Sequence, residues 1–599
     1  MQTFNNECVP RHHRRKKPAP AIVSAALVVT LGGLGVTVPV AAAPEYSVTK
    51  VLVAEDQYQG EAGVTPKPLY KPHEVVIDGG GKSVWITSNE RTEFAGITIF
   101  NVNRVLSVVN IDEPNVEFHG EDEEETIGNE EEEETTEPVE NFPPGRRMRP
   151  RVCLPVQLPP GAPVPRLDGG GPPASWFDPR DRIICAPLGA EMHARHPHGI
   201  DVDHNRLLVH QVIEHSGLKW NSDRTAFEVA ENTDEESGML LIYDISNQRN
   251  PKIVNGYLLG HGAHELAVND DDGRVWQGNH EDSPGVTPNI WVDLIDPSQG
   301  ENGYNFIDTG WYNAVQGIEV DESHSRVYGT THVGEKMFAF DAGCDPQPNA
   351  APDDEKQVGE NCILYTVDLR GPFFDQIPEA DAIFDIADQD VDSGTVLPSV
   401  LHMHDLTVDK VNQRAYQTLH SIHHAEHTGS PEEAALPPAE EGDEEEEPEH
   451  HFMGRWLAEV NVDSSSSDFM EVTYIDLSNG MNILDVPNVE DIPESTPFED
   501  QFVHAHWVAV DPDRGAVLAT GEHTGNLGVV DNESRDLEQV VAITIPIPNC
   551  EPELDEEGNP EFEEPHVHGV QVDLDVGGNV YVSDEGEHCF YESVTRLRP

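Results

Sequence analysis

The chain of 599 residues carries 111 Asp and Glu side chains against 36 Lys and Arg side chains, for a formal net charge of −75 at pH 7. A surface this acidic repels nucleic acid and anionic membranes, which excludes both as partners of the folded domain. The composition also includes 29 histidines and seven cysteines.

Residues 1–42 are predicted to be a signal peptide. A basic stretch at residues 11–17 precedes an apolar run from Ala19 to Val40, and small residues follow it. Because Pro44 would obstruct cleavage after Ala43, cleavage after Ala42 is favoured. The apolar run is also long enough for a membrane anchor, which stays an alternative. The sequence therefore favours a periplasmic or secreted protein that is free of the membrane after cleavage.

The mature part of the chain, residues 43–599, repeats one motif seven times. A histidine stands five residues before an Asp or Asn, at the start of a short apolar run such as His198-Gly-Ile-Asp-Val-Asp203. One of the seven motifs, the fourth along the chain, begins at Gln316 and keeps the apolar run without the histidine. Six matches in seven positions are very unlikely by chance. The six histidines are His73, His198, His264, His404, His506 and His568.

Each motif continues as a predicted hairpin. A turn follows, and a second β-rich run ends in another ionisable residue 16 or 17 positions after the first. Because the first and last residues of a hairpin are cross-strand neighbours, the two series should lie side by side. The second series is Glu90, His215, His280, His332, His420, His523 and Glu585. Four motifs add a histidine two residues upstream, on the same predicted strand face: His196, His402, His504 and His566.

Most copies add two more β runs, as at Met239–Asp244 and Lys252–Tyr257, or at Gly525–Val530 and Val540–Ile545. Four strands in each of seven copies predict an all-β fold, a seven-bladed β-propeller with blade heads near residues 73, 198, 264, 316, 404, 506 and 568. The strand Ser47–Val53, at the mature N-terminus, is expected to complete the last blade and close the ring.

Long insertions interrupt the repeats. Residues 112–192 and 430–453 are predicted to be low-complexity or irregular, and their acidic runs favour the solvated surface of a protein adapted to high salt. Six cysteines follow the signal peptide, and an even number in an exported chain indicates disulfides. Pairing of sequence neighbours is one of fifteen connectivities, and it gives Cys153–Cys185, Cys344–Cys362 and Cys550–Cys589.

The repeated histidines favour a metal centre at one mouth of the propeller. A single histidine in such a strand is usually a packing residue, and duplicated blades would inherit it. Up to eleven imidazoles at one mouth are electrostatically unfavourable unless they are neutral and ligated. Imidazole suits copper, zinc, iron and nickel, and this many histidines exceeds the needs of one zinc ion. The predicted ligands are His73, His198, His264, His404, His506, His568, His215, His280, His332, His420 and His523. Calcium in the Asp-rich turns is a further alternative.

A propeller with histidines from successive blades at one mouth resembles the copper propellers of the nitrous oxide reductase and thiocyanate dehydrogenase type. The resemblance covers the mature chain at the level of architecture and rests on the seven strand heads and the paired histidines. It implies two or three copper ions, a small inorganic or sulfur- or nitrogen-containing substrate, and a periplasmic electron carrier such as a cytochrome. The chain lacks the cupredoxin domain, with its Cys-x-x-x-Cys copper loop, that follows the propeller of nitrous oxide reductase. The methanethiol oxidase family stays an alternative.

Carboxylates near the histidines have two expected roles. Glu90 and Glu585 replace histidines of the second series and are candidate catalytic residues for proton transfer. Other polar residues adjoin the histidines and should point away from them on a regular strand: Glu74, Glu265, Asp405, Glu214, Asn279 and Glu522. Two rival functions stay open: a metal-storage or sensing protein without turnover, and a propeller interaction scaffold in which the histidines only pack.

Overall fold

The computed structural model divides the chain after Ala42 into two units, and every residue that it describes belongs to the second, Ala43–Pro599. The described residues are 45–53, 71–77, 83–88, 96–101, 104–110, 151–154, 156–157, 177–178, 183–187, 195–215, 218–220, 227–229, 237–248, 251–279, 291–298, 304–309, 315–332, 334–346, 359–387, 399–424, 452–493, 495–548, 550, 565–574, 578–586 and 589–599.

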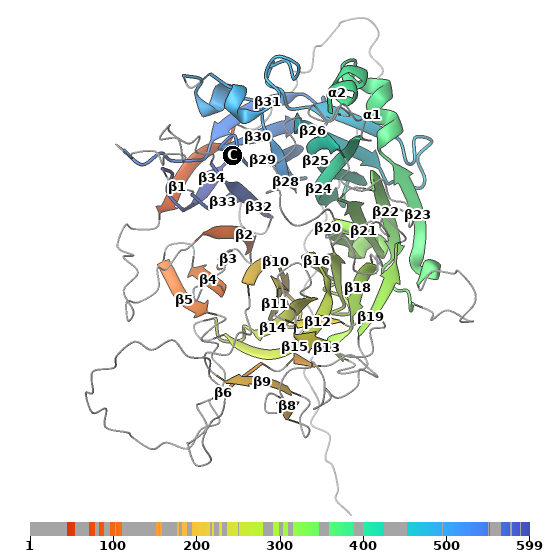
Figure 1. Ribbon diagram of the computed structural model, residues 1–599, viewed down its shortest axis with the longest axis vertical. Helices are drawn as coiled ribbons and strands as arrows, with labels where there is room; N and C mark the ends of the chain where they lie inside the picture. The colour runs from red at the N-terminus through yellow and green to blue at the C-terminus, as the bar shows by residue number, and fades with distance from the viewer. Residues whose placement is uncertain are drawn as a thin grey trace, which may run out of the picture. The chain divides into compact units, whose positions relative to one another are not determined.

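Six sheets of four strands and one sheet of five strands make up most of the described chain (Figure 1). Four of the four-stranded sheets, given from first to last strand, are β2 (Pro72–Ile77), β3 (Val84–Ser88), β4 (Gly96–Asn101), β5 (Arg104–Asn110); β16 (Ala263–Val268), β17 (Val275–Asn279), β18 (Trp291–Ile295), β19 (Tyr304–Asp308); β20 (Val315–Asp321), β21 (Arg326–Thr331), β22 (Lys336–Asp341), β23 (Ile363–Asp368); and β24 (Ser399–Asp409), β25 (Arg414–His424), β26 (Phe452–Asn461), β27 (Val472–Asp476).

The other two four-stranded sheets are β28 (Ala505–Asp511), β29 (Ala516–Gly521), β30 (Asn526–Asp531), β31 (Leu537–Ala542); and β32 (Val567–Asp573), β33 (Asn579–Asp584), β34 (Ser593–Arg598), β1 (Ser47–Val53). The five-stranded sheet is β10 (Arg195–Asp203), β11 (Leu208–His215), β14 (Ser237–Asp244), β15 (Lys252–His261) and, parallel to β15, β7 (Val156–Gln157). Smaller sheets are β6 (Arg151–Leu154), β9 (Ile183–Pro187), β8 (Phe177–Asp178); and β12 (Leu218–Trp220), β13 (Phe227–Val229).

The first strands of the large sheets contact one another in a closed cycle, in the order β2, β10, β16, β20, β24, β28, β32 and back to β2. Figure 1 shows the sheets standing around the common centre that these strands surround. Antiparallel sheets arranged radially in this way are a β-propeller, and the predicted all-β propeller is confirmed.

The N-terminal strand β1 pairs antiparallel with β34, with Val53 opposite Ser593. Tyr46, just before β1, is buried, and its hydroxyl donates a hydrogen bond of 2.9 Å to Asp511 Oδ2. Its main-chain N–H and carbonyl both bond to the side-chain amide of Gln539. The segment is therefore tied to two sheets at once, the one that contains β34 and the one that contains β28 and β31.

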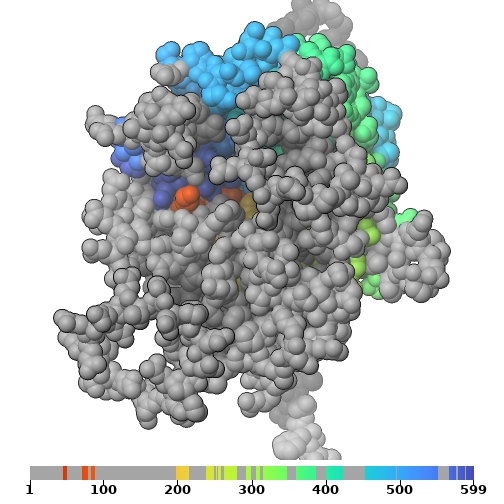
Figure 2. Space-filling view, in the orientation of Figure 1, coloured from red at the N-terminus to blue at the C-terminus, as the bar shows by residue number. Residues whose placement is uncertain are grey.

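Hydrophobic cores lie between neighbouring sheets. Val508 and Val517 of one sheet pack against Leu457 and Ile475 of the sheet before it. Since each first strand is covered on both sides, strands such as β2 and β28 are buried along their whole length, which explains their continuous apolar runs. Two helices, α1 (Arg370–Gln376) and α2 (Ala380–Ala387), extend the core around β24–β27. They adjoin the light-blue segment before β28 at the upper edge of Figure 2.

The disulfides Cys344–Cys362 and Cys550–Cys589 are both present, as predicted from their order in the sequence. The third predicted pair lies on β6 and β9, where Cys153 stands opposite Cys185 in the strand register, and the side chains of both lie outside the described residues. The predicted insertion 430–453 ends two residues late, because β26 begins at Phe452. The predicted run Val540–Ile545 corresponds to β31, which is displaced towards the N-terminus. None of the described helices is long and apolar enough to cross a membrane.

Candidate metal centre

The first strand of each large sheet breaks its register at the position of the repeated histidine. The pairing of β2 with β3 shifts between Pro72 and Val75, and that of β28 with β29 between Ala505 and Val508. The same shift occurs in β10, β16, β20, β24 and β32. Such a β-bulge disturbs strand alternation and re-aims side chains. The residues in the bulge are the repeated histidine, or Gln316 in β20, and the residue that follows it.

Threonine hydroxyls on the second strands satisfy the main chain of three bulges. Each accepts a hydrogen bond of 2.9 Å from a main-chain N–H: Glu74 to Thr87, Asp405 to Thr418 and Trp507 to Thr520. The hydroxyl of Thr418 also donates to the carbonyl of His506 in the next sheet. These threonines stand two or three residues before the second ionisable series, which is a sequence signal that the repeat analysis missed.

Close approach of neighbouring sheets also depends on glycine in some bulges. A Cβ atom at Gly569 would lie 2.9 Å from the main-chain nitrogen of Val75 and 3.0 Å from the carbonyl oxygen of His73. Both contacts are with backbone, which cannot move aside as a flexible side chain can. Gly569 therefore lets β32 and β2 approach until the imidazoles that they carry meet.

The six repeated histidines form a closed ring, which we call the inner ring. All six residues are buried, with 2–7% of their surface exposed. Ring centroids of successive members are separated by 4.2 Å (His73–His198), 3.6 Å (His198–His264), 5.5 Å (His264–His404), 3.9 Å (His404–His506), 4.7 Å (His506–His568) and 4.0 Å (His568–His73). Gln316 lies beside the widest separation, with its Nε2 3.4 Å from Nε2 of His264.

The indole of Trp507 lies near the axis of the inner ring. Its centroid is between 4.7 and 6.4 Å from all six imidazole centroids. The side chain is buried. It reaches this place because it follows His506 in the bulge of β28. Trp507 therefore fills the middle of the ring with an apolar surface.

A second set of histidines, which we call the outer arc, extends from one side of the inner ring. Its members come from the second series and from the upstream positions. Successive centroids are separated by 3.7 Å (His332–His402), 4.8 Å (His402–His420), 4.5 Å (His420–His504), 5.0 Å (His504–His523) and 4.8 Å (His523–His566). The structure thus brings the described members of both predicted series together.

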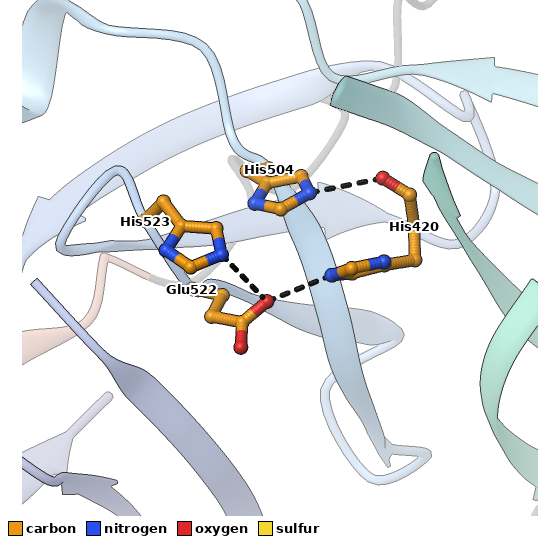
Figure 3. A group of neighbouring side chains, drawn as sticks. All are labelled: His420, His504, Glu522 and His523. Carbon is orange, nitrogen blue, oxygen red and sulfur yellow. Dashed lines mark hydrogen bonds and ion pairs between the residues drawn. The ribbon is translucent and has the colours of Figure 1, made fainter. Parts of the chain in front are cut away.

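Glu522 joins the outer arc to the inner ring. Its buried carboxylate lies between the rings of His420 and His523 (Figure 3). The imidazole nitrogens around it are Nε2 of His420 (2.8 Å), His523 (3.4 Å) and His506 (3.6 Å) at Oε2, and Nε2 of His568 (3.6 Å) and Nδ1 of His566 (4.0 Å) at Oε1. The prediction that Glu522 points away was wrong, because β29 ends at Gly521 and strand alternation no longer applies.

Burial acts on Glu522 and on the imidazoles in opposite ways. Burial opposes ionisation of the Glu522 carboxyl, but the imidazoles of His506 and His523 lower its pKa well below the usual value. Burial lowers the pKa of the imidazoles themselves, to about 3 for His568. Burial is also the main cause that lowers the pKa values of His404, His504 and His506 well below the usual value. These imidazoles are therefore neutral at pH 7, which is the form that binds metals.

Two carboxyls that follow ring histidines also face the ring. Glu74 Oε1 lies 3.0 Å from Nδ1 of His198, and Glu74 Oε2 accepts a hydrogen bond from the main-chain N–H of Ile200. Glu265 Oε1 lies 3.3 Å from Nδ1 of His264. Burial raises the pKa of both carboxyls, and Glu74 raises that of Glu265 further. The expectation that these side chains point away was wrong, because the bulges break the alternation of the strands.

Glu585, predicted as a catalytic carboxylate, lies between two members of the inner ring. Its Oε1 is 3.8 Å from Nε2 of His73 and 3.8 Å from Nε2 of His568. Glu90 and His280 lie outside the described residues, as does the side chain of His215. The main chain of His215 pairs with Arg195 across β10 and β11, near the inner-ring end of that hairpin.

Five groups of side chains have ligand atoms close enough together to hold a metal ion, all within 4.8 Å of one another. They are His420, His504, Glu522 and His523; His506, Glu522 and His568; His73, His568 and Glu585; His73, Glu74 and His198; and His198, His264 and Glu265. Two ligand atoms at about 2.0 Å from one cation lie about 2.8–3.3 Å apart for bond angles between square and tetrahedral. The separations around Glu522 match this range or exceed it by some tenths of an ångström.

Unused imidazole nitrogens complete the fit to a metal. The buried Nδ1 atoms of His404, His420, His504, His506 and His568 have no hydrogen-bond partner. A buried polar atom without a partner costs free energy, which a metal ion would remove by accepting a lone pair from the imidazole. The donor set of neutral imidazoles with a few carboxylates therefore fits a transition metal that prefers nitrogen.

No family model and no curated protein matches the chain. Among solved structures, the chain is similar to hydrazine synthase of Kuenenia stuttgartiensis, at 11% identity and a TM-score of 0.40, over 90% of this chain and 99% of that one. It is also similar to the β-propeller domain of Cps50 (Swd1) of Myceliophteria thermophila, at 8% identity and a TM-score of 0.39, over 92% and 99% of the two chains. With TM-scores below 0.5, these similarities support no conclusion about this chain.

Proposed function

We propose that this protein is an exported copper oxidoreductase whose cluster of two or three ions is held by the inner ring and the outer arc. One observation carries the proposal: three of the candidate groups share no residue and can therefore be filled at the same time. These groups are His420, His504, Glu522 and His523; His73, His568 and Glu585; and His198, His264 and Glu265.

The donor set favours a copper cluster over calcium, magnesium or a single zinc ion. Each of the three groups offers at least two imidazoles and one carboxylate, whereas calcium and magnesium prefer oxygen ligands throughout. A single zinc ion would use one group and leave the others without a role. Bound copper would supply one-electron oxidation and reduction, with the imidazoles as its ligands.

The side chains around the groups would orient the ligands and exclude water. Glu74 Oε1, 3.0 Å from Nδ1 of His198, would fix the orientation of that imidazole. Trp507 fills the axis of the ring, so a substrate would reach the centre from the side of the outer arc. The proposed substrate is a small inorganic or sulfur- or nitrogen-containing molecule. Glu585 and Glu90 are the proposed groups for proton transfer.

The electron acceptor is proposed to be a soluble periplasmic carrier such as a cytochrome. The net charge of −75 would attract a basic carrier and speed its association. The disulfides Cys344–Cys362 and Cys550–Cys589 agree with an oxidising compartment, the periplasm or the outside of the cell.

The proposed cluster needs a continuous wall, and we propose that seven blades closed by β1 provide it. The five-stranded sheet counts as one blade, with β7 as an addition to its outer edge. The closed cycle of contacts among the first strands and the pairing of β1 with β34 support this arrangement.

Copper-dependent turnover tests the proposal. The mature protein is reconstituted with Cu(II) and offered thiocyanate, thiosulfate and hydroxylamine with a soluble cytochrome as electron acceptor. We expect reduction of the cytochrome with at least one of these compounds, and its loss in the variants H198A and H506A. Stoichiometric copper without turnover on any small sulfur or nitrogen compound would instead indicate a storage or sensing protein.

A further inference from the structure

The carboxylate of Glu522 faces two sets of imidazoles with its two oxygens. We propose that Glu522 is a bridging ligand that joins a copper ion of the outer arc to a copper ion of the inner ring. This inference rests on the proposed copper cluster and adds to it that two of the ions are coupled through one carboxylate. The sequence offers Glu522 no place in either histidine series, so only its surroundings reveal this role.

Each oxygen has its own set of neighbours. Oε2 lies 2.8 Å from Nε2 of His420 and 3.4 Å from Nε2 of His523, both of the outer arc. Oε1 lies 3.6 Å from Nε2 of His568, a member of the inner ring, and 4.0 Å from Nδ1 of His566, a member of the outer arc. Oε2 also lies 3.6 Å from Nε2 of His506, which belongs to the inner ring. The nearest imidazole to Oε2 therefore belongs to the outer arc, and the nearest imidazole to Oε1 belongs to the inner ring.

The same residue belongs to two of the candidate groups, one in the outer arc and one that includes His506 and His568. Glu74 differs, because one of its oxygens is used by the main-chain N–H of Ile200. Both oxygens of Glu522 face imidazoles instead. A carboxylate in this position can bind one cation with each oxygen.

The main chain holds Glu522 between the sheets whose histidines it joins. Its N–H donates a hydrogen bond of 3.1 Å to the carbonyl of His504, and its carbonyl accepts one of 3.1 Å from the N–H of Val567. The first partner precedes β28, and the second begins β32, next to His568. Anchoring on both sides fixes the carboxylate before any ion binds, as an effective metal ligand requires.

The charge of Glu522 also fits the role. It is a buried carboxyl group whose close contacts with basic side chains are all with imidazoles, and no Lys or Arg side chain is among them. Burying an unpaired charge is costly, and two adjacent metal cations would compensate it.

Copper counting combined with spin counting tests the bridge. Copper per chain is measured in the fully oxidised, reconstituted mature protein, and unpaired spins are measured by quantitative electron paramagnetic resonance. We expect fewer spins than copper ions, because a carboxylate-bridged Cu(II) pair is magnetically coupled. In E522Q and in E522D, which keeps the charge but shortens the side chain, we expect the spin count to equal the copper count, with at most one ion lost. The matched control is E459Q, since Glu459 is an equally buried carboxylate that pairs with Arg414 and Arg535.

The outcomes separate the bridge from the cluster. A wild-type spin count equal to the copper count would overturn the bridge and leave copper binding in place. A spin deficit that persists in both E522Q and E522D would also overturn it, since another group would then couple the ions. If the wild-type protein takes up no stoichiometric copper, the proposed function itself fails, and the bridge fails with it.

Discussion

The imidazoles of the inner ring lie so close together that their protonation states depend on one another. Neighbouring centroids are 3.6–5.5 Å apart in a buried space, where a charge on one ring disfavours a charge on the next. Burial lowers the pKa of His404, His506 and His568, so these imidazoles are neutral at pH 7 and offer lone pairs to a metal without first releasing protons. The cost of this arrangement is sensitivity to acid.

Replacing His568 should make the metal-free protein less sensitive to acid. The folded-state pKa of His568 is about 3, below that of a histidine in the unfolded chain, so the unfolded state takes up a proton first as the pH falls. The neutral imidazole of His568 therefore makes its full contribution to the free energy of unfolding above about pH 6.5. Below pH 6.5 that contribution falls by up to about 1.4 kcal/mol per pH unit. We expect the difference in free energy of unfolding between wild type and H568Q to shift in favour of H568Q from pH 7 to pH 5.

Chemical denaturation of both proteins at each pH measures this difference. Buried carboxyls with a raised pKa, such as Glu74 and Asp405, act with the opposite sign, because their folded forms keep protons that the unfolded chain has lost. They are present in both proteins and cancel in the comparison. A difference that does not change with pH would contradict a neutral His568.

The hydroxyl of Thr418 should matter more than its size suggests. It accepts from the N–H of Asp405 and donates to the carbonyl of His506, and so links the bulges of neighbouring sheets. We expect T418V to lower the free energy of unfolding by about 1–3 kcal/mol, because both buried groups lose a partner. Chemical denaturation measures the loss, with T473V on the outer strand β27 as the control. Equal stabilities of T418V and T473V would show that the link has no energetic role.

At the scale of strands, the bulge is the element that builds the site. A regular strand would send the repeated histidine and its successor to opposite faces. The bulge lets both face the ring, which explains why Trp507 and Glu74 contact the imidazoles. The second strand of the hairpin supplies the threonine that stabilises this irregular backbone.

The N-terminal segment should contribute strongly to stability. Tyr46 is buried in the core between the sheets that contain β28 and β32, and its hydroxyl bonds to Asp511. We expect Y46A to lower the free energy of unfolding by about 3–5 kcal/mol, as for other buried aromatic side chains. The control is V48A on β1, whose exposed side chain should change stability by about 0.5 kcal/mol or less. Similar losses for the two variants would contradict the anchoring role of Tyr46.

Much of this fold could be predicted from the sequence, because the repeat reports strand heads directly. The motif located each first strand, and proximity in the sequence paired Cys344 with Cys362 and Cys550 with Cys589. Because the first and last residues of a hairpin are cross-strand neighbours, the sequence also predicted that the two histidine series lie side by side. The limits of later strands, such as β31, were less well predicted because their sequences lack a repeated marker.

The carboxylates of the site could not be predicted in the same way. Alternation along an ideal strand places Glu74 and Glu265 on the wrong face, since the bulge depends on the register between two strands. The side-chain direction predicted for Glu522 was wrong because Glu522 lies just beyond the end of β29. Both errors arise where regular geometry stops, and those are the places where the candidate site gains its carboxyl groups.

At the scale of the whole molecule, the excess of negative charge sets the conditions for stability. A net charge of −75 on the full chain makes the compact state repel itself, and dissolved salt screens that repulsion. We expect the thermal midpoint of the protein to rise by several degrees from low salt to molar KCl. Differential scanning calorimetry measures the midpoint, and a midpoint that falls or stays constant would contradict adaptation to high salt.

The metal content of the native protein tests the central claim most directly. The protein is purified from its native host without chelators, and its metals are quantified together with an electron paramagnetic resonance spectrum. We predict two or three copper ions per chain, and their loss in the variants H198A and H506A. No stoichiometric metal, even after reconstitution with copper, would contradict the account and leave the inner ring as packing between blades.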